Sequence, residues 1–132
     1  MNTIEFNPSF EVKFIKFCEW GLLEDCKKIL LMKPDMDISM YDIAFTDVCR
    51  RGNLQVAQWL LNVKPDIDIS AEYELAFRDA CINGHLPVAK WLLSVKPNID
   101  VNANNNSAFI YSCANGRLEV AQWLLSVKTD IE

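Results

Sequence analysis

The sequence predicts an all-α solenoid of about four stacked helix-turn-helix repeats joined by short extended loops. Two observations lead to this prediction: several residue types recur at a fixed interval, and apolar residues inside each interval follow helical spacing. The composition agrees, because 132 residues with 51% hydrophobic and 23% charged side chains suit one compact folded unit.

The interval is 31 residues once and 32 residues thereafter. A period in this range is typical of stacked units that share one continuous core. The residues that keep the period are Cys18, Cys49, Cys81 and Cys113; Gly21, Gly52, Gly84 and Gly116; Phe14, Phe45, Phe77 and Phe109; and Trp59, Trp91 and Trp123. We expect an N-terminal arm and four units, over residues 1–9, 10–39, 40–70, 71–102 and 103–132.

The third unit illustrates the elements in order. An apolar stripe within Leu75–Cys81 predicts the first helix, and Gly84 ends it because glycine accepts the left-handed backbone of a helix terminus. Pro87 marks the first turn of the second helix, which ends near Lys96, where a cation suits the helix dipole. In the second unit, the alternating residues 66–70 that follow the second helix predict an extended loop. Helices of about ten residues are marginal in isolation, so packing between units must stabilise them.

Charge and motifs exclude several classes of function. The net charge of −5 argues against binding a nucleic-acid backbone. No apolar run approaches the ~20 residues of a membrane span, and the first residues lack the pattern of a signal peptide, so we expect an intracellular, cytoplasmic chain without membrane attachment. A phosphate-binding loop and a nucleophile elbow are also missing from the sequence. We therefore expect neither catalysis nor a cofactor.

Two segments resemble a known family. Residues 76–86 resemble the ankyrin-repeat signature, and residues 118–125 resemble its second helix. The chain departs from the family's usual Thr-Pro-Leu-His start, where it has Leu75-Ala76-Phe77-Arg78. The resemblance covers about residues 10–132, and the Trp-Leu-Leu and Val-Lys-Pro-Asp-Ile-Asp segments resemble the ankyrin arrays abundant in giant DNA viruses of amoebae. It implies an ankyrin-type solenoid that binds a protein partner, which would be a host protein in the host cytoplasm if the chain is viral.

The five cysteines and the single histidine are the residues most capable of chemistry. Four cysteines follow the repeat and Cys26 replaces an alanine of the other units, so we expect five buried, inert thiols and no metal site. Equivalent positions on stacked helices are too far apart for a disulfide. His85 occupies the place of Asn53 and Arg117, which predicts a polar turn residue.

The recurring tryptophans have two interpretations. They either pack between repeats or form an exposed binding strip, and we prefer packing. Lys28 occupies the same place in the first unit, whose second helix is more charged than the others.

The positions where the repeat varies indicate where a partner binds. In an ankyrin stack, the residues just before each glycine line the concave groove together with the hairpin tips, and Trp, Tyr and Arg dominate the energy of many interfaces. The predicted partner-binding residues are Trp20, Tyr41, Arg50, Arg51, Tyr73, Ile82 and Tyr111. Two alternatives stay open: Phe6 or the rest of the arm covers Trp20, or the tyrosines pack inside the hairpin corners.

The last unit keeps the apolar pattern of the interior units, although the ends of a solenoid usually carry a polar face. The predicted function is thus a protein-binding module without catalysis. The alternative is an architectural protein that associates with itself through the last unit, so we expect a monomer or weak end-to-end association.

Overall fold

The computed structural model describes residues 9–131, apart from the side chains of residues 38 and 129–131. This part of the chain contains eight α-helices and no strand, which confirms the predicted all-α class. The helices are α1 (Phe10–Glu19), α2 (Leu23–Met32), α3 (Ile38–Arg51), α4 (Leu54–Val63), α5 (Ala71–Ile82), α6 (Leu86–Val95), α7 (Ala103–Ala114) and α8 (Leu118–Ile131). The predicted arm, residues 1–9, lies outside the described residues except for Ser9, and so does Phe6.

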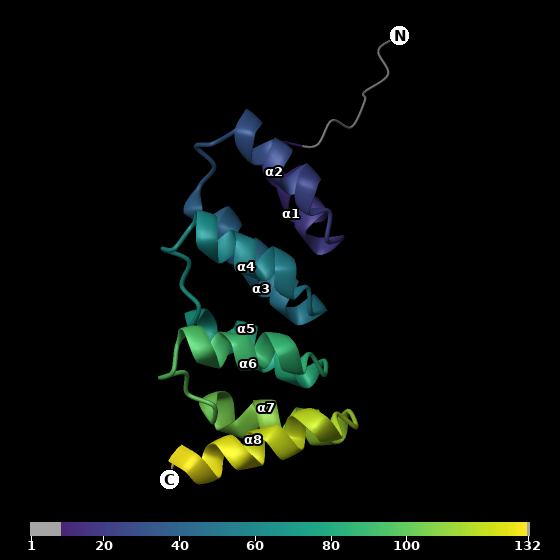
Figure 1. Cartoon of the computed structure of the whole chain (residues 1–132), viewed down its shortest axis with the longest axis vertical. Helices are drawn as coiled ribbons and strands as arrows, with labels where there is room; N and C mark the ends of the chain where they lie inside the picture. Colours follow the sequence, from purple (N-terminus) through teal and green to yellow (C-terminus); the bar gives the residue numbers. More distant parts are fainter. Residues whose placement is uncertain (1–8, 132) are drawn as a thin grey trace.

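The helices form four hairpin pairs that stack in chain order, with α1 and α2 at one end and α7 and α8 at the other (Figure 1). The odd-numbered helices pack directly on one another along the stack, and each also packs on the helix that follows it. We call α1, α3, α5 and α7 the inner helices, and the even-numbered ones the outer helices. The predicted solenoid of four stacked units is confirmed.

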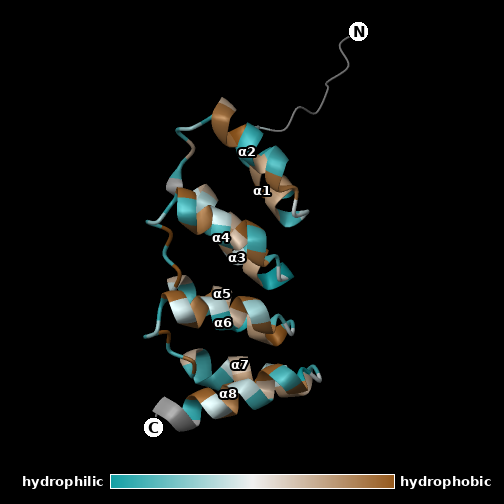
Figure 2. Ribbon diagram, viewed as in Figure 1, coloured by the Kyte–Doolittle hydropathy of each residue, from teal (hydrophilic) through white to brown (hydrophobic). Residues whose placement is uncertain are grey.

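Hydrophobic and hydrophilic residues alternate along every helix (Figure 2), so each helix buries one face in the stack. The tryptophans join neighbouring pairs through this core. The ring pairs are Phe14–Trp59, Phe45–Trp91 and Phe77–Trp123, with centroids 6.3, 6.1 and 6.1 Å apart. Each tryptophan therefore packs on the phenylalanine of the preceding unit, which confirms the packing interpretation. Lys28 stands at this place in the first unit and is exposed, because no earlier unit exists among the described residues.

The cysteine prediction is correct for four residues and wrong for one. Cys18, Cys26, Cys49 and Cys81 are buried, and all five cysteines are free thiols. Burial raises the pKa of the Cys81 thiol to about 12, so this group stays protonated near neutral pH. Cys113 is exposed instead, because the next inner helix that would cover it is missing from the described part of the chain.

The turn between the helices of a pair depends on glycine. Gly84 has φ of +80°, and its N–H donates to the Cys81 carbonyl at 3.0 Å, which closes α5 as predicted. A Cβ at Gly84 would also lie 2.9 Å from Cδ of Arg117, in the next unit. Both the backbone conformation and the close approach of the neighbouring repeat require glycine here.

The hairpin tips differ between units because of one residue. Eleven positions separate Pro34 from Phe45, and twelve separate Pro65 from Phe77. In the shorter connection α3 is helical from Ile38, and Asp37 caps it by accepting a hydrogen bond from the Ser39 N–H at 2.9 Å. In the longer ones the additional residue is accommodated by three consecutive left-handed residues, at 72–74 and again at 104–106.

Candidate functional site

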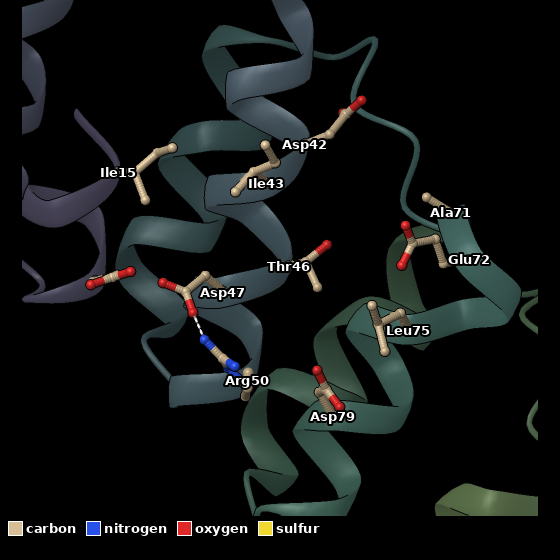
Figure 3. A pocket seen from close by; sticks show the side chains of 11 residues that line it. Ile15, Asp42, Ile43, Thr46, Asp47, Arg50, Ala71, Glu72, Leu75 and Asp79 are labelled. Carbon is tan, nitrogen blue, oxygen red and sulfur yellow. Dashed lines mark hydrogen bonds and ion pairs between the residues drawn. The ribbon is translucent and has the colours of Figure 1, made fainter. Parts of the chain in front are cut away.

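An open pocket of about 420 Å³ lies on the inner helices α1, α3 and α5 (Figure 3). We call it the inner-helix pocket. Its apolar lining is Ile15, Ile43, Ala71 and Leu75; its carboxylates are Glu19, Asp42, Asp47, Glu72 and Asp79; Thr46 and Arg50 complete it. Five carboxylates and one guanidinium thus surround an aliphatic surface, and this combination suits a ligand that is both cationic and apolar.

Three of the predicted binding residues gather at one end of α1 and α3. Trp20 is the C-terminal cap of α1 and is 61% exposed. Arg50 and Arg51 are the last residues of α3, and both form an ion pair with Asp47. In the second pair, Nε of Arg51 lies 3.6 Å from Oδ1 of Asp47. Arg51 also lies 3.9 Å from the carboxylate of Glu19, the residue before Trp20. The two arginines are therefore held by acidic side chains of their own chain.

Tyr73 and Tyr111 are accessible but lie elsewhere. Tyr73 is 78% exposed in the left-handed turn at the start of α5. Tyr111 is 53% exposed on α7 and does not line the inner-helix pocket. Ile82 is half-buried at the end of α5, and its carbonyl accepts long hydrogen bonds of 3.4 Å from Asn115 and Arg117. The predicted set is therefore spread along the stack.

The prediction for Tyr41 is wrong, because this side chain is fully buried. Its ring meets Phe14 edge-on with centroids 5.2 Å apart, and Nζ of Lys64 lies 5.0 Å from its centroid. The predicted tip at residues 40–42 is helical, so Tyr41 falls on the same face as Phe45, one turn later. For this tyrosine the alternative of packing inside the hairpin corner is correct.

The sequence prediction missed most of the pocket. Asp47 and Asp79 occupy one place in the repeat, where the first and last units have Lys16 and Tyr111. The sequence signal for the pocket was this variable position, because the charge of its residue changes from unit to unit while the adjacent core positions stay apolar.

Asp47 is the most buried charged residue of the pocket, at 7% exposure. Its Oδ1 pairs with the two arginines, whereas Oδ2 is buried and has no hydrogen-bond partner among the described residues. A buried polar atom without a partner costs about 1–3 kcal/mol.

Three further pocket carboxylates, Asp42, Glu72 and Asp79, form no ion pair with any residue that the structure describes. Desolvation raises the pKa of Asp79 above its ordinary range, although the positive charges of Arg50 and Arg78 oppose the shift. The middle of the pocket therefore has an excess of negative charge.

His85 belongs to the packing between repeats. A Cβ on Gly52 would collide with its imidazole, and the ring interacts with the backbone of Arg50. Desolvation and the charge of Arg117 lower its pKa. The expected role as a polar turn residue is consistent with this position.

Within residues 9–131, no three or more His, Cys, Asp or Glu side chains gather in a way that would hold a metal ion. The helices described are also too short or too polar to cross a membrane.

The class of protein follows from the stacked helix pairs and from a comparison with known families. A family model described as ankyrin repeats (3 copies) matches residues 16–105 and again residues 45–132. The chain therefore belongs to the ankyrin-repeat family. Comparison with curated proteins found no match. Ankyrin repeats generally mediate protein–protein interactions and form a non-catalytic module.

Proposed function

We propose that this chain binds a protein partner along its inner helices and hairpin tips and that it catalyses no reaction. The observation that supports this most is the inner-helix pocket, where Ile43 is exposed beside unpaired carboxylates. Accessible apolar and charged side chains on rigid helices give a partner both contact area and orientation.

The proposed contact surface contains the accessible members of the predicted set and the floor of the pocket. Tyr41 is removed from it because it is buried. The contact residues that we propose are Trp20, Arg50, Arg51, Tyr73, Ile82, Tyr111, Ile43 and Leu75. Trp20 is the strongest single candidate, because exposed tryptophans at protein surfaces are often the largest contributors to binding.

The test is affinity capture from the source cell with quantitative mass spectrometry. The double variant Trp20→Ala/Arg51→Ala should lose captured partner on the order of tenfold or more, since hot-spot residues contribute about 2 kcal/mol or more each. The matched control is Lys28→Ala/Lys90→Ala, which changes two exposed residues of the outer helices. Circular dichroism checks that both variants fold. Equal capture by the wild type and the groove variant contradicts the proposal.

A second function is favoured by the far side of α7 and α8. Leu118 is 68% exposed there, and Ile110, Tyr111 and Cys113 are exposed as well. The equivalent residue Cys81 is covered by the next unit, so this face has the pattern of a stacking surface. An architectural role through self-association would give a sedimentation coefficient that rises with protein concentration. The variant Leu118→Glu should then keep the monomer value at all concentrations.

From the sequence resemblance we also propose that the chain is of viral origin and acts in the cytoplasm of an infected amoeba. The partner is then a host protein, and capture from infected cells is the appropriate form of the test.

A further inference from the structure

We propose that the inner-helix pocket binds a basic amphipathic segment of the partner, in which an arginine or lysine stands next to a large apolar residue. This inference rests on the proposed function, because it names the chemistry of the partner for the same groove. The occupant follows from the charge, the burial and the apolar floor of the pocket, taken in turn.

The charge of the pocket excludes an acidic ligand. Its only cation, Arg50, already pairs with Asp47, and the nearby Arg51 bridges Asp47 and Glu19. Asp42, Glu72 and Asp79 form no ion pair with any described residue, although the charges of Arg50 and Arg78 act on Asp79. Asp42 and Glu72 would repel an incoming carboxylate or phosphate, and Asp79 is only partly offset by its neighbouring arginines, whereas a guanidinium or ammonium would pair with these carboxylates.

Asp47 provides an independent indication. Its side chain is more than nine-tenths buried, and Oδ2 accepts no hydrogen bond from any described residue. It belongs to the same cluster of side chains around the pocket in Figure 3. The two arginines share Oδ1, and the buried Oδ2 adds to the negative potential around the pocket without itself being accessible to a ligand.

The floor of the pocket requires apolar contact as well as charge. Ile43 is 50% exposed, and Leu75 on α5 faces it across the pocket (Figure 3). The stem of an arginine or lysine can lie on these aliphatic side chains while its head reaches the carboxylates above. A neighbouring leucine or aromatic side chain of the partner can fill the remaining volume of a pocket of about 420 Å³.

The experiment selects binders for the full-length chain from a random peptide library displayed on phage. Enriched peptides are synthesised, and their affinity is measured by fluorescence anisotropy for three proteins. These are the wild type, the groove variant Asp42→Asn/Glu72→Gln/Asp79→Asn, and the control Glu24→Gln/Asp25→Asn/Glu119→Gln, which removes the same charge from the outer helices. Chemical-shift mapping of the labelled chain locates the site. The groove variant removes only carboxylates that form no ion pair with a described residue, so we expect it to fold.

The expected result is enrichment of peptides that combine Arg or Lys with large apolar residues and that perturb Ile43, Thr46 and Leu75. The groove variant should bind them on the order of tenfold more weakly, and the control by less than about twofold. The inference is overturned by enrichment of acidic or neutral peptides, by no enrichment, or by equal weakening in both variants.

This outcome is separable from that of the proposed function. If Trp20→Ala/Arg51→Ala loses the natural partner while no basic peptide binds the pocket, the protein-binding function stands and this inference fails. If partner capture is unchanged in Trp20→Ala/Arg51→Ala and no basic peptide binds the pocket, both the proposed function and this inference fail.

Discussion

At the scale of single residues, position within the repeat decides what a side chain does. Trp20 and Trp91 are chemically identical, yet Trp91 packs on Phe45 and Trp20 is 61% exposed at a helix end. His85 is similar: it is the single histidine of the sequence, and its imidazole lies against Gly52 of the preceding unit.

The lowered pKa of His85 makes the stability of the fold depend on pH. Because the folded state disfavours the protonated ring, the contribution is complete above the unfolded value of about 6.5 and is lost as pH falls below it. His85→Asn uses the residue found at the equivalent Asn53, and it should abolish this loss. Urea unfolding at about pH 7.5 and about pH 5.5 measures the effect. Asp79 titrates in both proteins, so the informative quantity is the difference in pH dependence between the wild type and His85→Asn. An identical pH dependence of unfolding in the two proteins contradicts the role given to His85.

The two kinds of tryptophan should respond differently to truncation. Trp91→Ala should lower the free energy of unfolding by about 2–4 kcal/mol, because it removes a large side chain from the contact between two units. Trp20→Ala is the matched control and should change stability by less than about 0.5 kcal/mol. Comparable losses in chemical denaturation would mean that Trp20 is also a packing residue.

At the scale of elements, one inserted residue changes the start of an inner helix. The residues 104–106 of the last unit are all asparagine, which tolerates the left-handed conformation, whereas the third unit has Glu72, Tyr73 and Glu74. Arg78 holds that turn, since its Nε donates to the Tyr73 carbonyl at 2.8 Å and its Nη2 to the Glu72 carbonyl at 3.0 Å. The turn therefore stores backbone strain beside the inner-helix pocket.

Replacing Tyr73 by asparagine should relieve part of this strain. The left-handed conformation costs most residues roughly 1–2 kcal/mol, so Tyr73→Asn should raise the free energy of unfolding by up to about 1 kcal/mol. Tyr111→Asn, an exposed position within right-handed α7, should be neutral or slightly destabilising. A loss of stability in Tyr73→Asn would show that the tyrosine makes contacts that outweigh the strain.

At the scale of the whole molecule, the periodic features were predictable and the aperiodic ones were not. The stack, the glycine turns and the packed tryptophans followed from intervals that every unit repeats. Tyr41 was misplaced because its connection is one residue shorter, which extends α3 through the predicted tip. Asp42, Asp47 and Asp79 were missed because their role depends on three inner helices lying side by side.

The most direct test of the central claim, that the partner binds the inner helices, is site-specific photo-crosslinking in extract of the source cell. A photoreactive amino acid replaces Ile43, which is exposed in the inner-helix pocket, or Lys90, which is exposed on the outer helix α6. We predict a discrete adduct from position 43 that excess unlabelled chain competes away, and none from position 90. Adducts from position 90 alone, or equal adducts from both positions, would contradict the account.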